Sequence, residues 1–393
     1  MAYTPENNPY IPGDPYSYDL KWIVQKIRTT DEAIGSLDET IRAKVITALE
    51  NLYPVVYDNV ADMIDSNQSA ETLAYTLGYH QTSDGGSLLY FITDDYNDII
   101  GADYYVTIGP NKWALPLFLT EYVTPEMFGA LADGYDDTTA IQHCINRGGL
   151  VKFGAKVYNF TRLTIKSNVT LQGQGSGITS LVCIDSDTLD VGVSFGSALR
   201  KEDDGSRVYR FNVRDLNISA GSPFTGANED AYDKIIGLNL GACERSEINN
   251  VSITGFGCGA IVLSRAEDGS EGLGFVNTNQ DGNYNSISNI NIGGCGKYAP
   301  NGAAVDLHYK ANSNTLFNVC CKGISAGGFY VNGTGNNIIA GAVESALFIA
   351  DVIGSGNIFE GIRGEGISQF CFRCGTSSQY NIVLNPHLTS FGS

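Results

Sequence analysis

The sequence is poor in positive charge. Its 393 residues include 24 lysines and arginines against 43 aspartates and glutamates, a formal net charge of −19. Because nucleic acid is bound mainly through clustered lysine and arginine, this balance argues against a nucleic-acid partner. Charged residues are only 17% of the chain and hydrophobic residues 43%, which excludes a mainly disordered protein.

Long apolar runs are also missing. No apolar stretch reaches the roughly 18 residues that a membrane-spanning helix needs. Residues 1–20 have neither the basic region nor the apolar region of a secretory signal. We therefore expect no membrane insertion and no ordinary secretion.

The sequence contains no convincing metal site. Its nine cysteines are an odd number spread through apolar segments, which is typical of reduced core residues. Cys371 and Cys374 have CxxC spacing, but no second pair completes a zinc site, and strand alternation would place them on opposite faces. We expect neither a metal nor a cofactor.

The N-terminal part divides into three segments. Residues 1–16 are rich in proline, asparagine and tyrosine and predict an extended arm. Residues 17–53 predict a helical segment, because apolar residues recur every seven positions at Leu20, Ile27, Ile34, Ile41 and Ala48. Two interpretations stay open: two amphipathic helices packed on their own domain, or a short parallel bundle of identical chains. Residues 54–122 predict a small mixed domain with a hairpin-like part, from apolar runs at 88–92 and 104–108.

A helix is expected soon after residue 123. Asp136 or Asp137 would be its N-cap, because a carboxylate there accepts free backbone N–H groups and meets the positive end of the helix dipole. Its buried face would comprise Ala140, Ile141, Cys144 and Ile145.

After this helix the apolar period changes to two and the sequence repeats itself. Asparagine followed by a branched aliphatic residue recurs, with core anchors at Val169, Val213, Ile248, Ile287, Leu316, Ile338, Ile358 and Ile382. The later spacings of 22, 20 and 24 residues fit one turn of a right-handed parallel β-helix, in which each anchor stacks on the next at about 4.8 Å. The nearby asparagines fit tight turns or amide stacking. Residues 123–393 are therefore mainly β, a single-stranded parallel β-helix with a capping helix at its N-terminal end.

The longer spacings between the early anchors indicate insertions. For the first spacing, the 44 residues from Val169 to Val213, the alternative is two turns of which only one has a recognised anchor. The candidate inserted loops are residues 200–210, 221–235 and 264–284. Function in a stacked fold is usually carried by such loops.

The segment from Phe128 to Gln142, followed by residues 149–158 and 167–175, resembles the opening of the pectate-lyase-like β-helix domain of bacteriophage tailspikes. In this chain the motifs are FGALADGYDDTTAIQ, GLVKFGAKVY and SNVTLQGQG. Residues 60–95 resemble a small module that precedes such domains, and residues 8–22 resemble the anchoring segment of tail or collar appendages. These motifs comprise turns, caps and ladder positions, so they indicate fold more strongly than chemistry.

The resemblance implies a virion tailspike, made in the host cytoplasm, that binds a host surface polysaccharide and could cleave it. It implies a homotrimer, docked to tail, collar or portal-proximal proteins through its N-terminus. The implied anchoring residues are Pro9, Tyr10, Ile11, Pro12, Gly13, Asp14, Pro15, Tyr16, Tyr18 and Trp22.

Candidate site residues come from the inserted loops. Glycoside hydrolysis needs two carboxyl groups, and the candidate acids are Asp230, Asp233, Glu267, Asp268, Glu271 and Asp281. Tyr232 and Tyr284 are candidate platforms for stacking sugars. For any one acid, a solvated surface carboxylate is the more common role.

Two alternatives differ in class. One is a non-catalytic fibre or receptor-binding protein of the virion. The other is a secreted pectate lyase or polygalacturonase, which the missing signal and the isolated histidines disfavour. The net negative charge by itself favours a neutral glycan or a protein receptor, unless a local basic patch intervenes.

Overall fold

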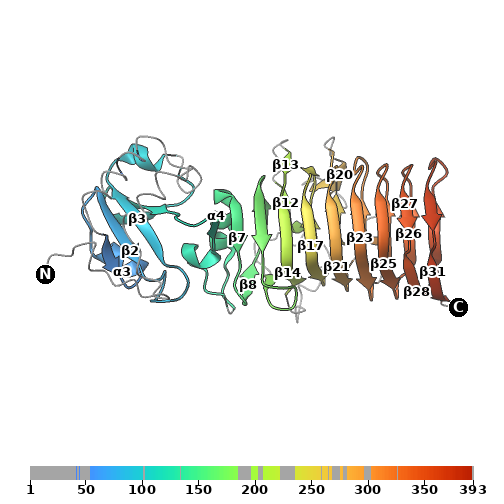
Figure 1. Ribbon diagram of the computed structural model, residues 1–393, viewed down its shortest axis with the longest axis horizontal. Helices are drawn as coiled ribbons and strands as arrows, with labels where there is room; N and C mark the ends of the chain where they lie inside the picture. Colours follow the sequence, from blue (N-terminus) through green and yellow to red (C-terminus); the bar gives the residue numbers. More distant parts are fainter. Residues whose placement is uncertain are drawn as a thin grey trace, which may run out of the picture. The chain divides into compact units, whose positions relative to one another are not determined.

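The computed structural model describes residues 41, 44, 54–100, 102–132, 134–184, 196–201, 207–221, 235–257, 259–263, 265–267, 275–277, 281–295, 302–324 and 326–391. The chain divides into two compact units, residues 1–129 and 130–393 (Figure 1). The expected arm of residues 1–16 and all ten anchoring residues, from Pro9 to Trp22, lie outside the described residues.

The first unit is a five-stranded sheet with short helices. The strand order is β1-β2-β3-β5-β4, with β1 (Val55–Tyr57), β2 (Thr72–Thr76), β3 (Leu88–Thr93), β4 (Val106–Gly109) and β5 (Lys112–Leu117). The helical elements are α3 (Val60–Asp65), η2 (Tyr96–Ile99) and η3 (Pro125–Phe128), and a two-residue strand β6 (Tyr122–Val123) follows the sheet. The apolar runs expected at 88–92 and 104–108 form β3 and β4. These two strands do not pair with each other, because β5 lies between them and forms the hairpin with β4.

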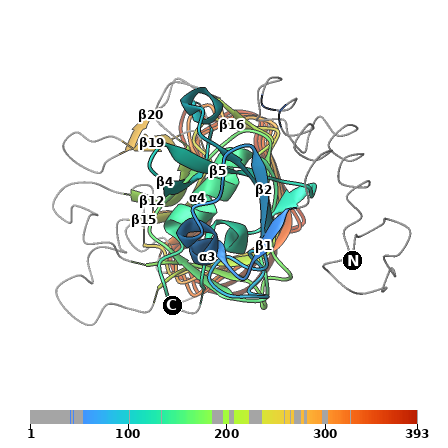
Figure 2. The ribbon, with the colours of Figure 1, turned by 90° about the vertical axis from the view of Figure 1, so that its left-hand side faces the viewer.

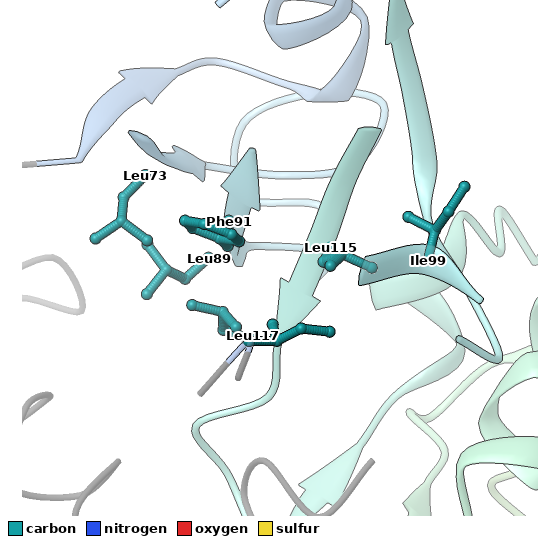
Figure 3. Close-up of a cluster of buried hydrophobic side chains, with 7 residues drawn as sticks. Leu73, Leu89, Phe91, Ile99, Leu115 and Leu117 are labelled. Atoms are coloured by element: carbon teal, nitrogen blue, oxygen red, sulfur yellow. The ribbon is translucent and has the colours of Figure 1, made fainter. Parts of the chain in front are cut away.

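The core of this unit includes one residue of the heptad pattern. Ile41, in a helix, is 5% exposed and belongs to the cluster whose other members are Leu73, Leu89, Phe91, Ile99, Leu115 and Leu117 (Figure 3). Lys44, one turn further on, forms ion pairs of 3.3 Å with Asp95 and with Asp98. Ile41 and Lys44 therefore contact the first unit, whereas the other residues of 17–53 lie outside the described part of the chain, and the two interpretations of the heptads stay predictions.

The second unit is built from parallel strands in two long sheets. The first sheet runs through β7 (Gly149–Lys152), β10 (Val169–Gln172), β14 (Asn212–Ala220), β17 (Glu247–Thr254), β21 (Ser286–Gly293), β23 (Thr315–Lys322), β25 (Asn337–Glu344), β27 (Ile358–Glu360) and β30 (Ile382–Leu384), with β8 (Val157–Phe160), β11 (Ser180–Cys183), β28 (Arg363–Ile367) and β31 (His387–Phe391) beside them. The second sheet runs through β9 (Leu163–Ile165), β12 (Gly196–Lys201), β15 (Ile235–Asn239), β18 (Gly259–Leu263), β22 (Ala303–Leu307), β24 (Gly327–Val331), β26 (Phe348–Val352) and β29 (Phe370–Cys374).

Each turn of chain pairs in parallel with the next turn, which makes this unit a parallel β-helix, as the repeat predicts. The long strands β14, β17, β21, β23 and β25 each bend at one residue with left-handed backbone, so that one strand serves two sides of a turn. Figure 1 shows the turns stacked side by side, and Figure 2 looks along the stack.

The helix α4 (Thr138–Arg147) precedes the first turn and buries the four expected residues. Its two aspartates divide the capping role. The Asp136 carboxylate accepts the N–H of Thr138 at 3.0 Å, whereas Asp137 reaches back to the N–H of Leu131 at 2.8 Å. The Gln142 side chain bonds the N–H and C=O of Thr164 in β9, at 2.8 and 3.0 Å, so α4 satisfies backbone groups at the edge of the first turn.

The register of the strands confirms five of the eight anchors and corrects three. Val213, Ile248, Ile287, Leu316 and Ile338 occupy one column, with Val151 and Leu171 before them and Phe359 and Val383 after them. Val169 is buried but pairs with Gly149, two residues away from the column. Ile358 and Ile382 pair with each other one residue away from it, and a shift of one residue turns a side chain to the outer face.

A stack of five asparagines, four of them buried and Asn381 half-buried, explains this register. Asn285, Asn314, Asn336, Asn357 and Asn381 stack on successive turns, each two residues before a column member. Each Oδ1 of the last four accepts the Nδ2 and the backbone N–H of the asparagine one turn earlier, at 2.9 to 3.1 Å. Every Nδ2 also bonds a backbone carbonyl. The stack therefore satisfies buried polar groups that would otherwise cost free energy.

The insertions lie within single turns. β10 and β14 are direct neighbours, so the spacing of 44 residues contains one turn with an insertion and not two turns. Between β18 and β22, β19 (Arg265–Glu267) pairs antiparallel with β20 (Phe275–Asn277). At another corner β13 (Val208–Tyr209) pairs with β16 (Cys243–Glu244).

Candidate functional site

One corner of the β-helix holds a column of residues with left-handed backbone. Its members have φ between 55° and 68°. The backbone N–H of each member donates to the carbonyl of the residue that directly precedes the next member, and Tyr380 is the last member of the column. They are Asn168, Arg210, Arg245, Tyr284, Ser313, Gly335, Gly356 and Tyr380. Glycine and asparagine adopt this backbone readily, whereas arginine and tyrosine do so rarely. From Tyr284 onwards, each member of the column directly precedes an asparagine of the stack. Arg245 precedes Ser246, whose N–H donates to Oδ1 of Asn285, the first asparagine of the stack.

Two arginines and two tyrosines of this corner are exposed on adjacent turns. Arg210, Arg245 and Tyr284 are consecutive members of the column, and Tyr209 lies beside Arg210. The side chains of Tyr209 and Tyr284 are 41% and 61% exposed. Neighbouring turns are about 4.8 Å apart. We call Tyr209, Arg210, Arg245 and Tyr284 the arginine–tyrosine corner.

An ion-pair network borders this corner. Arg207 bonds the carboxylate of Glu244, which is 8% exposed, and reaches Asp281 at 3.3 Å. Partial desolvation lowers the pKa of Arg207, but the charges of Glu244 and Asp281 outweigh it and raise that pKa overall. Arg207 therefore holds both acids that lie next to the corner, and its single charge offsets one of their two negative charges.

The structure places two of the eight candidate site residues near one another. Asp281 belongs to the Arg207 network, and Tyr284 follows three residues later in the corner. Glu267 lies in β19, outside the part of the chain whose side chains are described. The remaining five candidates, Asp230, Tyr232, Asp233, Asp268 and Glu271, lie outside the described residues.

The second sheet carries two buried carboxylates that the sequence analysis did not single out. Asp306, Tyr330, Asp351 and Arg373 pair across successive turns. Asp306 lies 3.6 Å from Nδ1 of His308, and Asp351 is bonded by the guanidinium of Arg373, which also lies over the ring of Phe370. Both acids are about 5% exposed. Asp351 and Arg373 hold two adjacent turns together, whereas Asp306 and His308 lie in the same turn.

Two classes of feature are missing from the described part of the chain. It contains no group of three or more side chains that could hold a metal ion. It also contains no helix long and apolar enough to span a membrane.

Known proteins resemble this chain in structure rather than in sequence. No protein-family model matches it, and no curated protein matches it by sequence. A tailspike from Acinetobacter baumannii bacteriophage Fri1, gp49, described as a capsular polysaccharide depolymerase, superposes with a TM-score of 0.59 at 14% identity over 84% of this chain. The enzymatically active domain of tailspike protein 2 from bacteriophage CBA120 gives 0.55 at 13% identity over 90%. The gp42 tailspike of Acinetobacter phage vb_AbaP_AS12 gives 0.50 at 12% over 86%.

The chain has the fold of phage tailspikes. It spans 62% and 55% of the first two tailspike chains and 74% of the third. At these identities the likeness concerns the tailspike fold, and individual site residues are not carried over.

Arg210 and Arg245 were not among the expected site residues. The sequence nevertheless contained a signal at these two residues. Both occupy the position directly before that of the asparagine stack, and other turns have Asn168 or Gly335 at this position. A long basic side chain at a position that suits glycine or asparagine is unusual. Recognising it requires the exact register, which the sequence alone left ambiguous.

Proposed function

We propose that this chain is a tailspike component of a phage virion whose β-helix binds a polysaccharide of the bacterial surface. The observation that carries the proposal is the exposed arginine–tyrosine corner on a tailspike fold. Aromatic rings present flat apolar faces that can stack on sugar rings, and guanidinium groups present donors for sugar oxygens. The asparagine stack beside the corner provides a rigid base, which lowers the entropic cost of binding.

Binding is better supported than cleavage by the described side chains. Hydrolysis of a glycosidic bond uses a protonated carboxyl group and a second carboxylate placed across the bond. Glu244 and Asp281 are engaged by Arg207, and Asp306 and Asp351 are nearly buried with cationic or imidazole partners. The non-catalytic receptor-binding form of the protein is therefore the version that this geometry favours.

The proposal includes assembly into a homotrimer. On the outer face of the first sheet, early turns carry Arg214, Asn249 and Ser288, whereas later turns carry mostly apolar side chains. We call five of these the C-terminal apolar face: Phe317, Ile339, Ile358, Ile382 and Leu384. One exposed carboxylate, Glu360, lies among them, because it pairs with Ile339 and Leu384 on the neighbouring turns. Contiguous exposed apolar patches are uncommon on monomeric proteins. We assign this face to contacts with other copies of the chain, and the N-terminal residues 1–16 to docking on the phage tail.

The test is a pull-down of purified full-length protein with bacterial surface polysaccharides, combined with a reducing-end assay on those it retains. Retention without new reducing ends supports a receptor-binding spike. New reducing ends would assign cleavage to the chain as well. Failure to retain any polysaccharide would refute the proposed function.

A further inference from the structure

The guanidinium groups of Arg210 and Arg245 have no carboxylate partner within the described residues. Arg207 forms ion pairs with both Glu244 and Asp281. In the described part of the chain, no carboxylate lies within 4 Å of the guanidinium groups of Arg210 or Arg245. Glu244 directly precedes Arg245 but is bonded by Arg207, and Glu247, two residues after Arg245, is exposed.

The fold does not require arginine at these two positions. Both residues have left-handed backbone, with φ of 56° and 55°. This conformation costs an L-residue about 1 kcal/mol or more. The same corner is occupied by Asn168, Gly335 and Gly356 in other turns. Two strained, exposed arginines on adjacent turns therefore point to a ligand rather than to packing.

The arrangement suits an anion that repeats along a chain. The two arginines lie one turn apart, about 4.8 Å along the stack. Tyr209 lies beside the first, and Tyr284 lies one turn beyond the second. A guanidinium group binds a carboxylate through two parallel N–H donors, and an aromatic ring beside it can stack on the sugar that carries that carboxylate.

We propose that the corner recognises an acidic polysaccharide, one whose sugars carry carboxylate groups. This inference rests on the proposed function and specifies its substrate class. The charge of −19 does not oppose it, because charges farther away than about 8 Å are largely screened at physiological ionic strength. Within the described residues, the guanidinium groups of Arg210 and Arg245 are free to bind carboxylates, and they form the basic patch that an acidic glycan needs.

The test uses an array of purified bacterial capsular and O-antigen polysaccharides in three classes: neutral, phosphate-bearing and carboxylate-bearing. The full-length protein is compared with the double variant Arg210→Asn/Arg245→Asn. Asparagine tolerates left-handed backbone better than arginine, so this variant should fold at least as stably. The matched control is Arg214→Asn, which removes an exposed arginine bonded to Gln172 on the neighbouring face.

We expect the strongest binding among carboxylate-bearing polysaccharides. Chemical reduction of their carboxyl groups, and the double variant, should each weaken it by about tenfold or more, whereas Arg214→Asn should not. The double variant should bind native and reduced polymer equally. Strongest binding to neutral or phosphate-bearing glycans, or unchanged binding by the double variant, would overturn the inference and leave the proposed function standing. Binding to no polysaccharide would overturn both.

Discussion

The side-chain amide of Asn314 donates to Oδ1 of Asn336 at 3.0 Å, one turn further along the β-helix. Its own Oδ1 accepts from Asn285, and its Nδ2 also bonds the carbonyl of Gly282. The residue is fully buried. One side chain therefore satisfies backbone and amide groups in three turns, which makes the stack a structural element as well as the base of the arginine–tyrosine corner.

Replacing this residue should be costly. Asn314→Ala leaves the backbone N–H of Asn285 without its acceptor and removes one donor each from Oδ1 of Asn336 and from the carbonyl of Gly282. A buried group left unsatisfied costs about 1–3 kcal/mol, and each lost hydrogen bond adds to this. We expect the free energy of unfolding, measured by urea denaturation, to fall by about 3 kcal/mol or more. Asn249→Ala is the control, because Asn249 is half-buried and bonds Ser288 at 2.9 Å. A similar loss for both variants would contradict a special role for the stack.

The corrected register can be checked with two adjacent residues. Phe359 is 1% exposed and belongs to the core column, whereas Ile358 is half-buried on the outer face. Phe359→Ala should lower the free energy of unfolding by about 3–5 kcal/mol. Ile358→Ala should lower it by about 1 kcal/mol, as expected for a half-buried side chain. Thermal or urea unfolding of the two variants distinguishes the two registers. A larger loss of stability for Ile358→Ala than for Phe359→Ala would support the register expected from sequence.

A pH dependence should arise from Asp84 in the first unit. Partial burial raises the pKa of Asp84, but hydrogen bonds from the N–H groups of Tyr79, His80, Gln81 and Gly86 outweigh it and hold that pKa below its usual range. A carboxyl group whose pKa is lowered on folding stabilises the protein above its unfolded pKa of about 3.9. That stability is lost as the pH falls through the lower, folded pKa.

We therefore expect Asp84→Asn to be less stable than the natural protein at pH 7 by about 1–3 kcal/mol. The difference should shrink as the pH falls below about 4, when the natural carboxyl group also becomes neutral. Melting temperatures measured between about pH 2 and 7 test this. Asp94→Asn, which changes an exposed carboxylate of the same unit, is the control. A difference that is constant with pH would exclude the charge of Asp84 as its cause.

The C-terminal apolar face predicts an effect on assembly. Phe317 and Leu384 are 48% and 44% exposed. Glutamate at either position would place an unpaired charge in the interface, and at position 384 it would also lie beside the like charge of Glu360. Sedimentation analysis should show the natural chain as a trimer, and Phe317→Glu/Leu384→Glu as a monomer with unchanged strand content. Ser288→Glu lies in the same column before the apolar turns and should leave assembly intact.

The fold could be predicted from the sequence because the residue pattern that determines it recurs in successive turns. Apolar alternation and the recurring asparagine–aliphatic pair predicted a parallel β-helix, and the column from Val213 to Ile338 has the expected register. The errors at Ile358 and Ile382 came from counting an aliphatic residue next to asparagine. The residue that faces the core lies two positions after the stacked asparagine, as Phe359 does after Asn357.

By itself, the sequence determined the stacked architecture, the capping helix and the placement of Tyr284 in a surface segment. Only the tertiary structure brought Arg210, Arg245 and Tyr284 onto neighbouring turns, because insertions of different length separate them along the chain. It also showed that Asp281 shares an ion pair with Arg207. Stacking aligns residues by their place in the turn and not by their separation in sequence, so side chains from distant segments form a surface that no local pattern records.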